Sequence, residues 1–280
     1  MSFFDESAWE QDTIERLSEP LGWLPVRGEE IAPGSDERDT WDDPLIRPRL
    51  LDGLRRLNPG IPAEYLRQAV AEIASPKSQD ALTENHRIHQ YLVSGYPLSY
   101  IDTDGREQNP RLRLLGADPS DNDWLAVNQV TVRQGDAHRR FDIVLYVNGM
   151  PLSIIELKRA GAKSAGVADA HDQLRTYLRE FPMAFRFCVL TLASDGLDAK
   201  YGTPFTPDES LRPRGTSMTT ASRCPNRGSR TASRSSRSTT RSTDCSTRSG
   251  SCSSCGTSRR STRTPTVWPS ALPSRTNTSP

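Results

Sequence analysis

The sequence has no run of 18 consecutive apolar residues and no short apolar stretch behind a basic amino terminus. A membrane-spanning helix needs about 20 mostly apolar residues, and a secretory signal peptide needs an apolar stretch of about 7–15. We therefore expect neither a membrane span nor a signal peptide. Cysteine is also scarce, because Cys188 is the single cysteine of residues 1–210. One thiol in an apolar run is typical of a cytoplasmic protein.

Lysine is absent from residues 211–280, although this segment contains 13 arginines, 18 serines and 14 threonines. Its one acid is Asp244, so the segment carries a net charge of +12 (13 minus 1), and residues 1–210 carry −11 (23 bases, 34 acids). Aliphatic residues are too few in this segment to offset the entropy that ordering would cost. We expect residues 208–280 to form a disordered tail and residues 1–207 to form the folded domain.

The hydrophobic pattern changes its period near Gly95. Before that point, apolar residues recur at helical spacing over residues 5–18, 48–57, 62–73 and 83–93. After it, strand-like runs occupy residues 97–102, 111–116, 124–134, 140–147, 151–158, 185–194 and 197–202. A helical pattern at 166–180 separates two of these runs, which predicts a crossover between parallel strands. We expect an α/β fold, with a mixed sheet flanked by helices and an α-rich section at about 36–93.

Charges interrupt two of the apolar strands. Asp142 lies in the first, and Glu156 and Lys158 lie in the second. Buried ionised side chains are costly unless they are paired or bind a ligand. Two carboxylates from adjacent strands can bind a hard divalent cation, and a nearby ammonium can orient a water and offset charge on a phosphate oxygen. The pattern favours metal-dependent phosphodiester hydrolysis, with cross-strand charge pairing on an exposed face as the alternative.

The register of this hairpin decides whether the two carboxylates can meet. A plain two-residue turn would pair Asp142 with Ile155 and direct Glu156 to the other face of the sheet. We therefore predict a three-residue loop, residues 147–149, with Gly149 at positive φ in a G1 bulge. This loop would place Asp142 opposite Ile154 and diagonal to Glu156.

Two helices offer further polar side chains to the same site. Gln173 and Tyr177 are four residues apart and so share one face of the helix at 166–180, from which they could hold the substrate backbone. An ordinary polar surface is the alternative. The amino-terminal helix offers Glu10 as a third metal-binding acid, with Glu15 as the alternative.

Residues 2–207 resemble the amino-terminal nuclease region of the R (restriction) subunit of type I restriction enzymes, a PD-(D/E)xK nuclease. This resemblance implies that the expected α/β fold is of the restriction-endonuclease-like type. The similar segments are residues 31–34, 56–62, 82–100, 122–132, 141–158, 173–177 and 190–203. The resemblance implies that Asp142, Glu156 and Lys158 are catalytic and metal-binding, and that Gln173 and Tyr177 form a Q-x-x-x-Y motif. Phe141 departs from the proline usual in the family.

The resemblance also implies an activity and partners. Such an enzyme cleaves double-stranded DNA with Mg²⁺, in a complex with modification (methyltransferase) and specificity subunits. In the family an ATP-driven translocase follows the nuclease, but the sequence has no G-x-x-x-x-G-K-[ST] motif and hence no expected ATP site. We therefore expect a truncated R subunit. The alternative is a catalytically silent fragment that only docks on DNA or partner subunits.

The resemblance ends near Asp208, where the Ser/Thr/Arg-rich tail begins. A shift of reading frame would produce such a change, and we interpret the tail as a frameshift product. The alternative is a natural basic arm that binds nucleic acid, although such arms normally mix lysine with arginine.

Overall fold

The structure is a computed structural model that describes residues 6–158, 166–207 and 210–213. The chain divides into two units, residues 1–220 and 221–280, and the described residues all belong to the first. Apart from residues 210–213, the expected disordered tail lies outside the described residues. The domain boundary at residue 207 stays a prediction.

The helices lie close to where the hydrophobic periodicity predicts them. The α-helices of the described residues are α1 (Glu6–Ser18), α2 (Arg47–Leu57), α3 (Ala63–Ala74), α4 (Ala81–Ser94) and α5 (Val167–Glu180), and the 3-10 helices are η1 (Pro119–Asp121) and η2 (Pro182–Phe185). Asp80 caps α4 by accepting a hydrogen bond from the Thr83 N–H at 2.8 Å. The expected α-rich section is helical only from Arg47 on; residues 36–46 form bends and irregular backbone.

Seven strands of the described residues form one sheet. In spatial order they are β1 (Leu24–Arg27), β6 (Trp124–Gln134), β7 (Ala137–Val147), β8 (Met150–Leu157), β9 (Leu190–Ser194), β10 (Ala199–Gly202) and β11 (Arg212–Pro213). The pairs β1–β6 and β8–β9 are parallel, whereas the other pairs are antiparallel. α5 connects β8 to β9. The predicted α/β fold, its mixed sheet and its parallel crossover are therefore confirmed.

Three strand predictions need correction. The runs at 97–102 and 111–116 contribute only the two-residue strands β2 (Tyr96–Pro97), β3 (Tyr100–Ile101) and β5 (Arg111–Leu112), which with β4 (Glu107–Gln108) form two small sheets apart from the main one. In the run at 185–194 the strand begins only at Leu190, after η2. Phe187 and Cys188 are fully buried although they precede the strand. An apolar run indicates burial, and burial alone does not distinguish a strand from other buried backbone.

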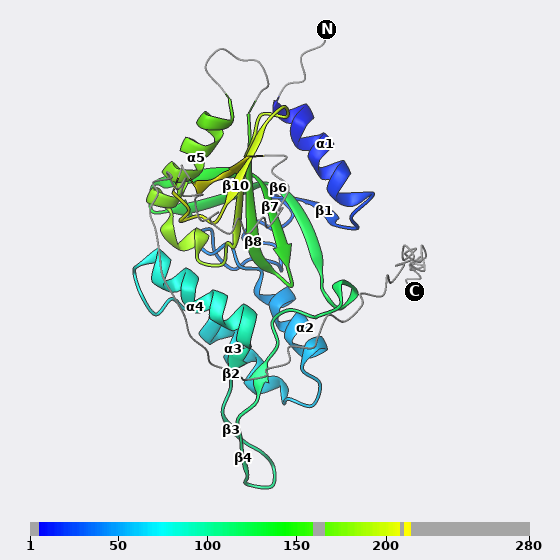
Figure 1. Cartoon of the computed structure of the whole chain (residues 1–280). Coiled ribbons are helices and arrows are strands. Elements are labelled where there is room, and N and C mark those ends of the chain that lie inside the picture. Colours follow the sequence, from blue (N-terminus) through cyan, green and yellow to red (C-terminus); the bar gives the residue numbers. More distant parts are fainter. Residues whose placement is uncertain (1–5, 159–165, 208–209, 214–280) are drawn as a thin grey trace, which may run out of the picture. The chain divides into compact units, whose positions relative to one another are not determined.

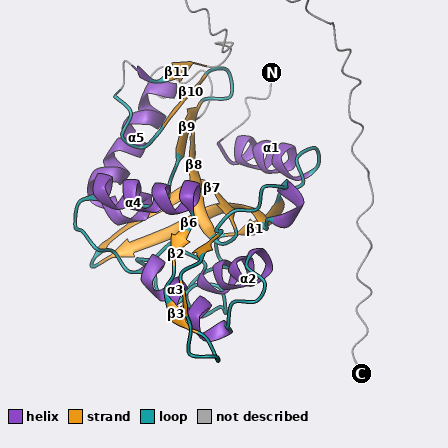
Figure 2. Cartoon of the chain, turned by 60° about the horizontal axis from the view of Figure 1, so that its bottom comes forward, coloured by secondary structure: helices purple, strands orange, loops and turns teal. Residues whose placement is uncertain are grey.

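The helices α1 and α5 cover opposite faces of the sheet (Figure 1). Leu174 and Tyr177 of α5 belong to one buried cluster, and Ile14 of α1 belongs to another with Ile143 and Leu157. A third cluster joins α2, α3 and α4 to the turn end of the β7–β8 hairpin. Figure 2 shows β8 and β9 between α5 on one side and α1 on the other. The end of the hairpin that carries the predicted site is therefore flanked by α1 and α5.

Candidate active site

The turn between β7 and β8 differs from the predicted loop. Val147 pairs with Met150, so the turn contains two residues, Asn148 and Gly149. Both have positive φ, 49° and 78°, as a type I′ turn requires and as an Asn-Gly sequence favours. The left-handed Gly149 is confirmed. The three-residue loop is wrong.

The extra residue that aligns the carboxylates lies inside β8 instead. Leu145 pairs with Ser153 while Tyr146 pairs with Pro151, which leaves Leu152 as a bulge. Beyond the bulge, Ile143 pairs with Ile155, and the same register places Asp142 beside Glu156. The predicted partner Ile154 is therefore wrong, although the expectation of a bulged hairpin is confirmed. One residue inserted in a strand changes the face as effectively as one inserted in the loop.

Asp142 is anchored by the backbone of the neighbouring strand. Its Oδ2 accepts a hydrogen bond from the Leu157 N–H at 2.8 Å. Burial raises the pKa of Asp142, while the Leu157 N–H and the charge of Lys158 act in the opposite direction. The side chain is thus fixed in orientation and holds a proton more readily than an exposed aspartate.

Glu156 is the more deeply buried carboxylate, with an exposed fraction of 0%. Its Oε1 accepts a hydrogen bond from Lys158 Nζ at 3.2 Å, whereas its Oε2 has no hydrogen-bond partner within the described part of the chain. Burial, and then the charge of Asp142, raises the pKa of Glu156 to about 8. An unpartnered, buried carboxylate oxygen is costly unless it receives a proton or a cation.

Lys158 connects the sheet to α1. Its Nζ also donates to Glu6 Oε1 at 3.0 Å. Burial disfavours the charged ammonium, but the hydrogen bond to Glu6 and the charge of Glu156 together raise the pKa of Lys158. The sequence interpretation missed Glu6, although Glu6 and Glu10 lie at the i, i+4 spacing that places two side chains on one helix face.

Glu10 is directed toward the site by a distorted residue of β6. Gln129, with φ 58°, interrupts the β6–β7 ladder at the position opposite Asp142, and its Nε2 donates to Glu10 Oε2. Burial raises the pKa of Glu10, and the charge of Asp142 acts in the same direction. Glu15, the alternative acid, is exposed and accepts a hydrogen bond from Gln11 on the same helix. The structure thus brings Glu10, and not Glu15, close to Asp142.

Gln173 and Tyr177 share one face of α5, as predicted, and Gln173 Nε2 donates to the Tyr177 hydroxyl. The Tyr177 ring is buried and meets the ring of Phe141 edge-on, with centroids 5.3 Å apart. Burial raises the pKa of Tyr177, and the charge of Glu156 adds to this effect. The pair therefore lies beside the carboxylates and not on a remote helix surface.

The donor set suits a hard divalent cation only in part. Asp142 and Glu156 supply two carboxylates, and the unpartnered Oε2 of Glu156 is an available oxygen ligand. Across residues 6–158, 166–207 and 210–213, however, no three His, Cys, Asp or Glu side chains converge as a metal-binding group. Glu10 is hydrogen-bonded to Gln129, so its role as a third ligand stays a prediction.

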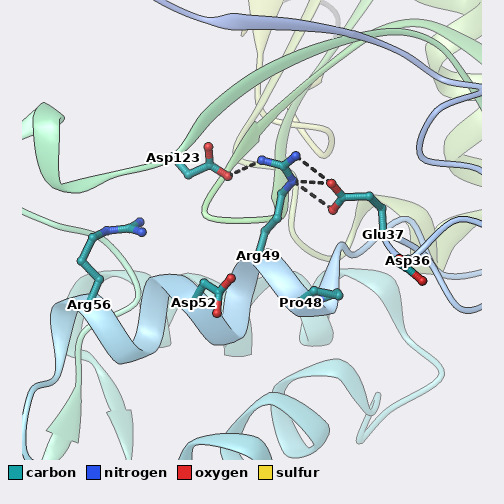
Figure 3. A pocket seen from close by; sticks show the side chains of 7 residues that line it. All are labelled: Asp36, Glu37, Pro48, Arg49, Asp52, Arg56 and Asp123. Atoms are coloured by element: carbon teal, nitrogen blue, oxygen red, sulfur yellow. Dashed lines mark hydrogen bonds and ion pairs between the residues drawn. The ribbon is translucent and has the colours of Figure 1, made fainter. Parts of the chain in front are cut away.

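A separate cluster of charges lies at the turn end of the hairpin, around a hollow of about 470 Å³. Arg49 of α2 donates to Glu37 at 2.7 Å and to Asp123 at 2.9 Å (Figure 3). Arg56 donates to the Oδ1 of the buried Asn148 at 2.9 Å. Arg56 thus binds the turn directly, and Arg49 binds Asp123, whose carbonyl oxygen accepts a hydrogen bond from the Asn148 N–H. The cluster therefore stabilises the hairpin that carries Asp142 and Glu156.

Comparisons with known proteins agree with the resemblance seen in the sequence. A family model described as type I restriction enzyme R protein N terminus matches residues 3–210. The type I restriction enzyme HindI endonuclease subunit of Haemophilus influenzae is 28% identical over 203 residues, which are 71% of this chain and 19% of that protein. The SsaAORF53P endonuclease subunit of Staphylococcus saprophyticus is 34% identical over 82 residues, 29% of this chain and 8% of that protein.

A third relative comes from Methanocaldococcus jannaschii, and its name assigns it provisionally to the same class of endonuclease subunit. It is 25% identical over 199 residues, which are 70% of this chain. The chain spans 19% of the length of this relative and of the Haemophilus protein. Among the helices of the described residues, none is long and apolar enough to cross a membrane.

Proposed function

The chain belongs to the family of type I restriction enzyme R proteins, and we propose that it carries the Mg²⁺-dependent endonuclease centre of such an enzyme. The substrate is double-stranded DNA, and the reaction is hydrolysis of its phosphodiester bonds. One observation carries the proposal: the buried carboxylate of Glu156 and the half-buried carboxylate of Asp142 meet an ammonium, Lys158, at one end of the sheet. Buried charges of this kind are rare without a function.

Each side chain has a role that its contacts support. Asp142 and Glu156 would hold the cation, which when bound supplies Lewis-acid polarisation of the phosphate and lowers the pKa of a water. Lys158 donates hydrogen bonds to that water or to a phosphate oxygen, in exchange for its bond to Glu6. Gln173 and Tyr177 donate hydrogen bonds that hold the DNA backbone beside the carboxylates. Glu10 contributes a further acid near Asp142.

The rest of the proposal concerns the assembly in which this centre works. The chain spans 19% of the length of the Methanocaldococcus and Haemophilus relatives. The ATP-driven translocase would therefore lie in another part of a full-length R subunit. Modification and specificity subunits are the proposed partners, and the specificity subunit would choose the DNA sequence. A complex acting on DNA in this way would work in the cytoplasm.

The test is cleavage of plasmid DNA with Mg²⁺ by the full chain and by its Asp142→Asn and Lys158→Ala variants, alone and together with the modification and specificity subunits. Loss of a group that transfers a proton or stabilises charge costs at least about 100-fold in rate. Circular dichroism checks the fold. Asp52→Asn is a matched control, because Asp52 is an exposed acid of α2 whose partner is Arg55.

Undiminished cleavage by either site variant would refute the assignment of the site. If the parent chain fails to cleave in every combination but still binds DNA or the partner subunits, the alternative of a silent docking fragment holds instead.

A further inference from the structure

We propose that the outer face of the β6–β7 ribbon binds DNA phosphates through Arg133 and Arg140. The inference rests on the proposed nuclease function and adds the side from which the DNA backbone approaches the carboxylates. It names two positioning residues that no motif of the sequence indicated. Both arginines are exposed, as is His138 between them.

The strand pairing places these side chains on one face. Thr131 pairs with Arg140, and Arg133 pairs with His138. Directly opposed residues of an antiparallel pair share a face, and residues two apart on a strand also share one. The remaining face of the ribbon carries three residues of the buried core: Val130, Val132 and Phe141. The basic face is therefore the outer one.

Arg133 is held in position but keeps its hydrogen-bonding capacity. Its guanidinium carbon lies 4.2 Å from the centroid of the Trp41 ring, and its backbone N–H donates to the Trp41 carbonyl oxygen at 3.0 Å. Stacking on an aromatic ring restrains a guanidinium while leaving the N–H groups at its edge exposed. Within the described residues, neither the Arg133 nor the Arg140 guanidinium forms an ion pair. A restrained guanidinium with unused donors is suited to a phosphate.

Arg140 lies beside the carboxylate site. It is two residues from Asp142, and its charge acts on Glu10, on which the charge of Asp142 also acts. Glu10 is thus close to both residues. A phosphate bound to Arg140 would lie on the α1 side of the site, next to the position at which the scissile phosphate must meet Asp142.

The other arginines of the described body show why these two stand out. Residues 1–210 carry a net charge of −11, and such a surface repels DNA. Many of the basic side chains are neutralised by nearby acids: Arg16 by Asp12, Arg49 by Glu37, and Arg139, next to Arg140, by Glu180. Arginines without such a partner near the site can give a net attraction to a phosphate.

The test measures how DNA binding depends on salt. The full chain carrying Asp142→Asn, which prevents cleavage, is titrated against a labelled duplex of about 20 base pairs at 50–200 mM NaCl, with and without Arg133→Ala and Arg140→Ala. The slope of log K (the association constant) against log NaCl concentration is negative. Each lost phosphate contact should reduce the magnitude of this slope by about 1. For the double variant we expect the magnitude of the slope to fall by about 2 and DNA binding to be at least about 10-fold weaker at 50 mM NaCl.

The control is Arg67→Ala, which removes an exposed arginine of α3 and should leave affinity and slope unchanged. The 13 arginines of residues 211–280 contribute equally to every variant and cancel in the comparison. Arg140→Lys keeps the charge and should restore most of the slope. With Asp142 intact, the double variant should raise KM for DNA while kcat stays within about threefold.

Two results would overturn the inference. One is a double variant with parental affinity and slope. The other is a double variant that binds DNA normally but no longer binds the modification and specificity subunits, which would make the basic face a protein-docking surface. Because binding is measured in a cleavage-deficient background, a parent chain that does not cut DNA refutes the proposed function without deciding this inference.

Discussion

Asp142 lies beside Glu156 because Leu152 adds one residue to β8. Without that bulge the type I′ turn would direct the two carboxylates to opposite faces of the sheet. The turn has no freedom to correct the register, since the side chain of Asn148 donates to the carbonyl oxygen of Leu114 and accepts from Asp123 N–H. The site thus depends on two local features at the beginning of β8, a fixed turn before Met150 and a bulge at Leu152.

The fixed turn gives the first prediction, that Gly149→Ala destabilises the fold. Gly149 has φ 78°, and a Cβ there would lie 2.3 Å from the carbonyl oxygen of Ile46. Gly105 has φ 75° but open space around its Cβ position, so Gly105→Ala is a control with the same backbone strain and no clash. We expect a loss of at least about 2 kcal/mol in unfolding free energy for Gly149→Ala and about 1 kcal/mol for the control. Urea denaturation measures both, and equal losses would contradict the clash.

The buried carboxylate gives a second prediction, on pH. Burial raises the pKa of Glu156 from an ordinary 4.5 to about 8, so between these values the folded chain retains a proton that the unfolded chain releases. The free energy of unfolding should therefore fall as pH rises through this window, with a slope of up to about 1.4 kcal/mol per pH unit for one proton. Glu156→Gln removes this titration and should flatten the slope.

Urea denaturation between pH 5 and pH 8.5, in the presence of a chelator, measures these slopes. Burial also raises the pKa of Asp142, so some dependence of the same sign should remain in the variant. If the free energy of unfolding had the same pH slope in the parent and in Glu156→Gln, Glu156 would not titrate in this range.

The sequence predicted most of the fold and the relative placement of several residues of the candidate site. Strand alternation placed Glu156 and Lys158 on one face, and the hydrogen bond between them confirms that placement. Helical periodicity placed Gln173 beside Tyr177. Both inferences succeed because they depend on residues close together in the sequence, where the period of the backbone fixes the direction of each side chain.

Contacts that depend on tertiary packing were not predictable in the same way. The bulge at Leu152 leaves no mark on the alternation of a strand whose residues are all buried. The distortion at Gln129 is supported by packing, since a Cβ on Gly28 would lie 2.2 Å from the Gln129 carbonyl oxygen. Glu6 reaches Lys158 across 152 positions of sequence. Spacing along one chain segment carries no information on contacts of this kind.

The contact of Glu6 with Lys158 gives a third prediction. Its hydrogen bond favours the ammonium form and so helps to raise the pKa of Lys158. In Glu6→Gln, the alkaline limb of the pH–rate profile for DNA cleavage should move to lower pH, because Lys158 loses its proton more easily. The rate at neutral pH should change by less than about 10-fold, since Glu156 still holds the lysine. A purely structural role for Glu6 would lower the rate at all pH values without moving the limb.

The fourth prediction separates the two acids of α1 that the sequence left as alternatives. Glu10 accepts a hydrogen bond from Gln129 and lies near Asp142, whereas Glu15 is exposed and its carboxylate accepts a hydrogen bond from Gln11 on the same helix. Glu10→Gln should therefore lower the cleavage rate by about 10-fold or more and raise the Mg²⁺ concentration needed for half-maximal rate, because it removes one negative charge beside the proposed cation site. Glu15→Gln, the same change one and a half turns further along the helix, should leave both quantities as in the parent. A Mg²⁺ titration of cleavage by the two variants decides the matter, and equal effects would show that α1 contributes only its general negative charge.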